Sequence, residues 1–212
     1  MLSLVPRCSL VLYLVISSLA YAKAPFDSLV IQTGRRWFFG TSSFLANEVS
    51  GTLFYEISGL PLEMGGGFSF FNIKKEGLDV LDHWVKVEGA WGYEISLEAK
   101  LCLPNAMFAL PFTPYLIYAH DLFSDYEIKG RTQVGGTKSQ ASTNGYKFNV
   151  GVDLPMNPSL TMNVEYSVGS QSIKHKYIRS FSVEIDDNVR REGSVEGSLE
   201  SQAFLIGLGI RV

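Results

Sequence analysis

Apolar residues recur at every second position along several stretches of the chain. The clearest stretch covers residues 91–102, where Trp91, Tyr93 and Ile95 begin an alternation with glycine, serine and charged residues. A period of two places all the apolar side chains on one face of a β-strand, whereas a helix would repeat near 3.6. The pattern is strong over residues 52–58, 91–102, 145–154, 160–168 and 203–212, and weaker over 31–40, 64–73 and 112–121. The sequence therefore predicts an all-β fold of eight strands.

The connections between these strands alternate in length. Residues 58–61, 104–109 and 155–158 are short and contain proline, whereas residues 42–50, 72–88, 122–142 and 170–198 are longer and more polar. Short turns at one end and long loops at the other are typical of an up-and-down outer-membrane β-barrel, with the turns in the periplasm. Residues 173–185 are rich in β-forming residues, so we expect the last hairpin to continue beyond the membrane as a paired ribbon.

The first 22 residues have the organisation of a signal peptide. Arg7 supplies a positive charge, an apolar run follows, and the sequence Ala20-Tyr21-Ala22 provides the small residues that a signal peptidase requires. We therefore expect a signal peptide at residues 1–22 and a barrel at residues 23–212. An uncleaved anchor helix is the alternative, although the apolar run is short for crossing a bilayer. Removal of the leader leaves Cys102 as the only cysteine, so no disulfide is expected within the barrel.

Composition and charge indicate which side of the barrel wall faces lipid. The chain is 46% hydrophobic and 18% charged, and its net charge of -3 gives no reason to expect a nucleic-acid partner. Charged side chains cannot find partners in lipid, so they must face the lumen, and the sheet must close because an open edge would leave unpaired backbone groups. We expect a polar network in the lumen made of Glu56, Glu94, Glu98, Lys100, Lys147, Asp153, Glu165 and Arg211, with Arg36 as a further cation.

The pattern as a whole resembles the small outer-membrane β-barrel proteins of the OmpA-barrel, OmpX and opacity-protein kind. The resemblance implies an eight-stranded antiparallel barrel in the outer membrane of a Gram-negative bacterium, surrounded by lipid and lipopolysaccharide. Residues 201–212 resemble the terminal strand that such proteins present to the barrel-assembly machinery. They differ from it in ending with Val212, where an aromatic residue is typical.

The sequence indicates a structural or surface-interaction role and no chemistry. We expect a filled lumen with little conductance, because eight strands leave room only for side chains. Basic residues in 122–142 and 170–198 suit contact with lipopolysaccharide or an extracellular partner that the sequence does not identify. The main alternative is a narrow porin-like channel or a transporter of small or hydrophobic solutes. An outer-membrane lipid-modifying enzyme and a soluble lipocalin-like carrier are further alternatives.

We expect no catalytic, cofactor-binding or metal-binding residues. The suggestive neighbours His120 and Asp121 would point to opposite faces of a strand, so they could not act together. The run Gly65-Gly66-Gly67 lacks the lysine and the helix pattern of a phosphate-binding loop, and close packing of strands explains it better.

Overall fold

In the computed structural model, long β-strands account for nearly all of the described chain, which comprises residues 26–40, 42–73, 78–80, 83–103, 111–132, 135–181 and 189–212. The first four strands are β1 (Ser28–Gly40), β2 (Ser42–Glu56), β3 (Leu62–Ile73) and the three-residue β4 (Leu78–Val80). The other five are β5 (His83–Cys102), β6 (Thr113–Thr132), β7 (Gly135–Asn157), β8 (Leu160–Phe181) and β9 (Val189–Arg211). The expected signal peptide and the turn at residues 104–109 lie outside the described residues.

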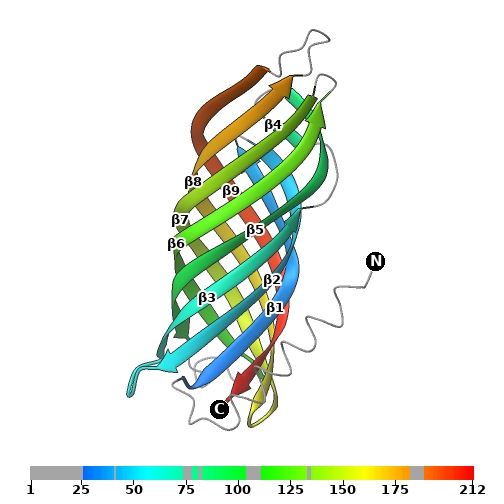
Figure 1. Ribbon diagram of the computed structural model, residues 1–212. Helices are drawn as coiled ribbons and strands as arrows, with labels where there is room; N and C mark the ends of the chain where they lie inside the picture. The colour runs from blue at the N-terminus through cyan, green and yellow to red at the C-terminus, as the bar shows by residue number, and fades with distance from the viewer. Residues whose placement is uncertain are drawn as a thin grey trace.

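The eight long strands form a closed barrel (Figure 1). Each strand pairs antiparallel with its neighbours in the chain, and β1 pairs with both β2 and β9. This last pairing removes the two free edges that an open sheet would have, as a bilayer requires. The short β4 pairs with the ends of β2 and β5 at one rim. The predicted eight-stranded up-and-down barrel is thus confirmed, including the three strands that had weak alternation.

Tight turns and the described chain ends gather at one end of the barrel. Residues 57–61 join β2 to β3, and Gly59 adopts a φ of 81°, which is a conformation that side-chain-bearing residues rarely accept. Pro158 and Ser159 join β7 to β8, so this turn is even shorter than expected. The backbone N–H of Val212 donates to Asp27 at this end (3.0 Å). By the orientation rule for such barrels, this end faces the periplasm.

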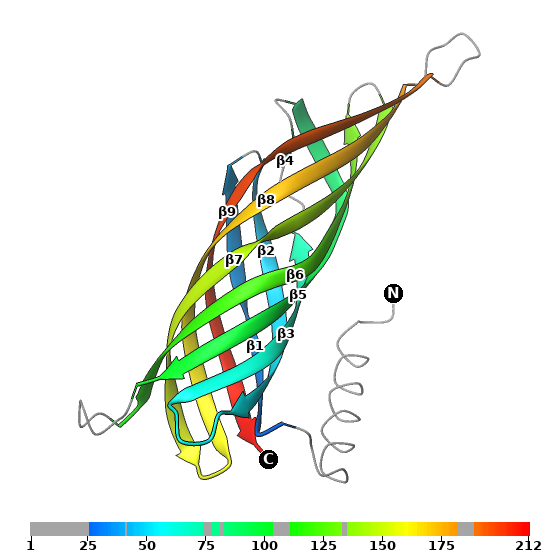
Figure 2. The same cartoon turned by 90° about the vertical axis from the view of Figure 1, so that its left-hand side faces the viewer.

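Strands continue far into the opposite end, where the sequence had suggested loops. Residues 42–50 belong to β2, and most of residues 122–142 belong to β6 and β7, so both predicted loops were wrong. The expected pairing after residue 173 is confirmed up to Phe181, which pairs with Val189 (Figure 2), whereas residues 182–185 of the predicted ribbon lie outside the described residues. These polar stretches were predicted to be loops because they lack an apolar face. A strand outside the membrane has water on its faces and needs no apolar side.

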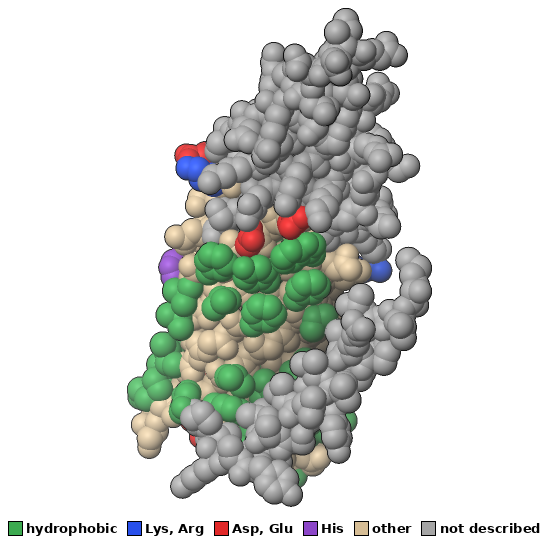
Figure 3. Space-filling view, in the orientation of Figure 1, with side chains coloured by type: hydrophobic (Ala, Val, Ile, Leu, Met, Phe, Trp, Pro, Cys, Tyr) green, Lys and Arg blue, Asp and Glu red, His purple; other side chains and the backbone are tan. Residues whose placement is uncertain are grey.

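The outer wall in the turn-side half of the barrel is apolar. Along β7, the outward side chains Tyr146, Phe148 and Val150 are 45–58% exposed, while Lys147 and Asn149 between them are 9% exposed or less. Figure 3 shows such apolar side chains spread over the described wall, with acidic side chains above them. Aromatic pairs such as Tyr118 and Phe148, with ring centroids 5.2 Å apart, strengthen this surface. A wall that exposes hydrocarbon in this way is suited to lipid.

A β-bulge in β6 changes which residues face inward. The register against β5 shifts after Asp121, and both Leu122 and Phe123 point outward, each at least half exposed. Beyond this point the inward positions are Ser124 and Tyr126. The bulge therefore delivers a tyrosine to the lumen from a strand whose simple alternation would have turned it outward.

Among the described residues, no helix is long and apolar enough to cross a membrane.

Candidate functional site: the barrel interior

The lumen is filled with charged and polar side chains that come from all parts of the chain. The inward positions of successive strands carry Glu94, Lys100, Lys147 and Glu165, and each of them is 5% exposed or less. Charges that are removed from water need partners close by, so the arrangement of these groups decides whether the interior is stable.

A charged cluster around Lys147 occupies the half of the lumen nearer the long hairpins. Lys147 on β7 donates to Glu94 on β5, and its ammonium nitrogen lies 3.0 Å from Asp121 Oδ1 on β6. Gln171 on β8 donates to both carboxylates, at 2.8 Å and 2.6 Å. Tyr126 also donates its hydroxyl to Glu94. Four neighbouring strands are therefore joined across the lumen as well as through their backbones.

A second ion pair completes this level on the other side of the barrel. Both Arg36 on β1 and Glu48 on β2 are buried, and the guanidinium makes two hydrogen bonds to the carboxylate, of 2.8 Å and 3.0 Å. A two-point contact of this kind fixes orientation as well as charge. The rings of Phe38, Phe71 and Tyr126 pack beside it, with centroids 5.8–6.0 Å apart. Polar pairing and aromatic packing thus fill the same cross-section.

Two carboxylates in the middle of the barrel have hydrogen bonds but no ion pair among the described residues. Glu98 accepts from Ser96 (2.9 Å), and Glu165 accepts from Gln32 (3.3 Å) and from the hydroxyl of Tyr115 (3.1 Å). Space for Glu98 comes from Gly67 across the β3–β5 pair, where a Cβ would lie 2.2 Å from Glu98 Oε1. The close-packing explanation of the glycine run therefore fits at this position.

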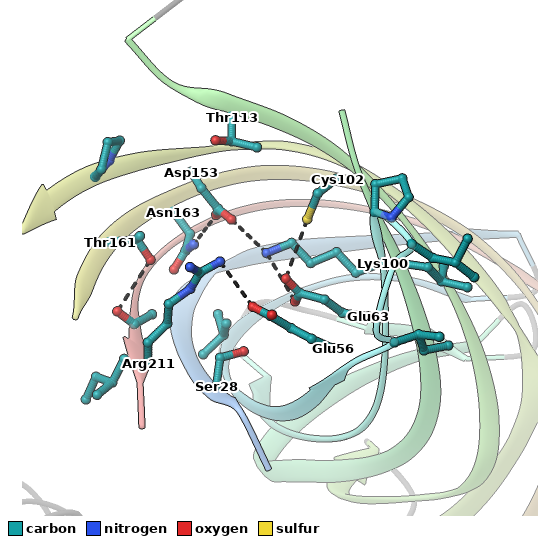
Figure 4. Close-up of a pocket in the computed structure, with 18 of the residues that line it drawn as sticks. Ser28, Glu56, Glu63, Lys100, Cys102, Thr113, Asp153, Thr161, Asn163 and Arg211 are labelled. Atoms are coloured by element: carbon teal, nitrogen blue, oxygen red, sulfur yellow. Dashed lines mark hydrogen bonds and ion pairs between the residues drawn. The ribbon is translucent and has the colours of Figure 1, made fainter. Parts of the chain in front are cut away.

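A third cluster closes the lumen near the turns. Lys100 on β5 donates to Asp153 on β7 (2.7 Å), and its nitrogen lies 3.8 Å from Glu63 on β3 (Figure 4). Asn163 on β8 donates to Asp153, and the thiol of Cys102 points to Glu63. The Lys100 ammonium also lies 4.4 Å from the centre of the Tyr115 ring, which is a favourable cation–π distance.

A cavity of about 610 Å³ lies on the turn side of this third cluster. Lys100, Glu63, Asp153 and Asn163 contribute to its polar lining, and the two turns around Leu60 and Pro158 contribute to its rim. We call this cavity the turn-end pocket.

The structure separates two of the expected lumen residues from the buried set. Glu56 and Arg211 pair with each other at 3.2 Å, but their side chains are 51% and 62% exposed. They are the last residues of β2 and β9, so they lie at the mouth of the barrel and remain in contact with water. The expectation that they belong to the enclosed lumen was wrong. Glu94, Glu98, Lys100, Lys147, Asp153 and Glu165 do lie within the lumen, in the three arrangements described above.

Several interior residues were not recognised from the sequence. Glu48, Tyr126 and Gln171 fall in stretches that looked like loops, and Glu63 precedes the range in which a strand was predicted. The signal that could have found Glu48 is its spacing of four residues from Thr52 and six from Phe54, because both also point inward. Spacing could not have identified Tyr126, because the β-bulge in β6 changes which residues after Asp121 point inward.

The one neighbour pair that suggested chemistry, His120 with Asp121, is divided between the two faces of β6. His120 is exposed on the outer face and Asp121 is buried in the lumen, so the two cannot cooperate. Within the described part of the chain, no group of three histidine, cysteine or acidic residues is placed to hold a metal ion.

Comparison with solved structures identifies the architecture. Neisserial surface protein A (NspA) matches with a TM-score of 0.52 and 13% identity, over 87% of this chain and 97% of the other. A major outer membrane protein from Thermus thermophilus matches with a TM-score of 0.51 and 13% identity, over 87% and 99%. This chain has the fold of the small outer-membrane β-barrels. No protein-family model and no curated protein sequence matches it.

Both the fold and the apolar outer wall indicate where in the cell this barrel lies. The matched structures are a neisserial surface protein and a major outer membrane protein, and this barrel covers at least 97% of each. The described outer wall exposes aromatic and aliphatic side chains that alternate with polar inward positions. Together they place this barrel in a bacterial outer membrane.

Proposed function

We propose that this outer-membrane barrel is non-enzymatic and non-conducting, and that it serves the envelope as a structural anchor that presents a β-ribbon at the cell surface. The observation that supports a closed lumen is the crossing of the interior by ion pairs at two levels. Lys147 with Glu94 and Asp121 fills one level, and Lys100 with Asp153 fills the other. An eight-stranded barrel has little interior to spare once such groups are in place.

The ribbon of β8 and β9 is the part of the proposal that concerns the surface. A strand crosses a bilayer with about 9–11 residues. β8 and β9 have 22 and 23 residues and stay paired to their ends, so roughly half of each extends past the lipid. The chain from 174 to 191 carries Lys174, His175, Lys176, Arg179, Arg190 and Arg191. We propose that this ribbon contacts the phosphates of lipopolysaccharide or an anionic extracellular partner.

The last strand, β9, carries the part of the proposal that concerns barrel assembly. β9 ends at Arg211 and joins β1 to complete the ring, so its outward residues Phe204, Ile206 and Leu208 form a terminal amphipathic strand. We propose this strand as the segment that the barrel-assembly machinery binds before closure.

Single-channel recording tests the closed lumen. The refolded barrel, residues 23–212, is added to a planar bilayer after heat-modifiable migration on a gel has shown that it is folded. We expect insertion without steady conductance. Discrete, stable openings would refute the filled lumen and favour a narrow channel for small solutes.

Binding to lipopolysaccharide tests the ribbon separately. A shortened barrel, in which residues 174–196 are replaced by a two-residue turn, should still fold because every inward ion pair described above lies outside the deleted part. We expect it to lose association with lipopolysaccharide vesicles. The matched control replaces the acidic Glu184, Asp186 and Asp187 with neutral residues and should keep binding. Equal binding by the shortened barrel would contradict a role for the ribbon.

A further inference from the structure

Two oxygen atoms of the turn-end pocket accept no hydrogen bond, although one of them, Glu63 Oε2, lies 3.8 Å from the Lys100 ammonium. Glu63 Oε2 and Asn163 Oδ1 accept no hydrogen bond, and the two residues are only 8% and 1% exposed. Buried acceptors without donors are costly, at about 1–3 kcal/mol each. Both residues line the pocket, and in Figure 4 they lie on either side of the Lys100–Asp153 pair.

Three donors of the pocket are engaged with other groups. Lys100 donates to Asp153 and lies over the ring of Tyr115, and its distance of 3.8 Å from Glu63 Oε2 is an ion pair too long for a hydrogen bond. The thiol of Cys102 points to the other oxygen of Glu63, and Asn163 gives its amide hydrogen to Asp153. Glu63 Oε2 and Asn163 Oδ1 are therefore acceptors available to a ligand that donates hydrogen bonds.

Charge restricts the class of that group further. Three acidic residues and two basic residues line the pocket, namely Glu56, Glu63 and Asp153 against Lys100 and Arg211, so one negative charge is in excess. A bare metal ion does not fit, because no group of three ligating side chains is placed to hold one within the described residues. The volume of about 610 Å³ is in the range of sites for small organic molecules.

We propose that the turn-end pocket binds a small organic cation through a primary ammonium group. The ammonium would donate hydrogen bonds to Glu63 Oε2 and Asn163 Oδ1 and would neutralise the excess negative charge. Leu60, Leu62 and Pro155 contribute apolar surface to the pocket, which suits a short hydrocarbon portion of the same ligand. The ligand enters from the side on which the turns lie, so its source is the periplasm. This inference does not depend on the surface role of the ribbon.

Alkylation of Cys102 provides the test, because this half-buried thiol lines the pocket and is the only cysteine in residues 23–212. Its rate of reaction with iodoacetamide is measured in detergent micelles at increasing concentrations of propylammonium. We expect the rate to fall with saturation. Tetramethylammonium at the same ionic strength has the charge but no N–H donor, so it should give no protection. No protection by propylammonium, or equal protection by both cations, would overturn the proposal.

Two variants with the same loss of charge locate the effect. In Glu63→Gln the acceptor is replaced by an amide, so we expect protection by propylammonium to weaken at least tenfold. Glu196→Gln removes a carboxylate from the exposed ribbon and should leave protection unchanged. Heat-modifiable migration confirms that each variant is folded. Unchanged protection in folded Glu63→Gln would show that the ammonium does not bind where we propose.

A lipid could supply the same ammonium group, and vesicles distinguish this source from a free amine. The alkylation rate is compared in vesicles of phosphatidylethanolamine and of phosphatidylcholine without added amine. Slower reaction only with phosphatidylethanolamine assigns the ammonium to a lipid head group and supports the site. Equal rates, together with protection by propylammonium, assign it to a soluble amine.

Discussion

Replacement of Lys147 by methionine should strongly weaken the barrel. The substitution keeps all but the last atom of the side-chain length and removes the cation that contacts both Glu94 and Asp121. The side chains of these two carboxylates are 1% and 0% exposed, so water cannot replace the ammonium. Removal of one partner from a buried ion pair costs about 3–5 kcal/mol. We expect Lys147→Met to lose stability in this range.

Urea unfolding of the barrel in lipid vesicles measures the loss. With a slope of roughly 2 kcal/mol per molar urea, the expected change lowers the midpoint by about 2 M. The matched control is Lys174→Met, because Lys174 makes an ion pair of similar length (2.7 Å) with Glu196 on the exposed ribbon. Water surrounds both partners there, so the control should unfold at the same urea concentration as the unmodified barrel.

The double variant Lys147→Met with Glu94→Gln separates lost attraction from stranded charge. If the cost arises from leaving buried carboxylates without a cation, neutralising one of them should restore part of the stability. The reasoning would be refuted if Lys147→Met had the same urea midpoint as its exposed control Lys174→Met. It would also be refuted if the double variant were less stable than Lys147→Met by as much again as Lys147→Met is less stable than the unmodified barrel.

Three further substitutions test other parts of the structure. Val150→Arg places a charge in the middle of the lipid-facing wall and should cost about 2–4 kcal/mol in vesicle unfolding, so a cost near zero would contradict the assigned wall. Gly92→Ala puts a Cβ 2.3 Å from the ring of Tyr126, and we expect the resulting displacement to cost about 1–3 kcal/mol in the same assay. Outside the membrane, the hydrogen bond from Lys174 lowers the pKa of Glu196. The Lys174–Glu196 ion pair is therefore complete above the ordinary pKa of a glutamate, and it is lost as the pH falls through the lowered pKa. An NMR titration should show this pKa rising to its ordinary value in Lys174→Met.

The sequence predicted the wall of the barrel better than its rim or interior. Alternation identified the outward Tyr146 and Phe148 and the inward Lys147, because lipid imposes an apolar face on each membrane-crossing stretch. Beyond the lipid this constraint ends, and residues 42–50 therefore looked like a loop although they form part of β2. The exposed position of Glu56 was missed for a similar reason, since alternation indicates a face and says nothing of height along the barrel.

The sequence alone determined the class of the fold, the number of strands and, for the five strongly alternating strands, the side that meets lipid. All three depend on the local period of two and on the cost of placing charge in hydrocarbon. The tertiary structure decided which inward groups meet. Lys100 pairs with Asp153, which is 53 residues away, and Arg36 donates to Ser201, which is 165 residues away. Such partners are set by the stagger between strands and by the closure of β1 on β9, and no local pattern in the sequence records either one.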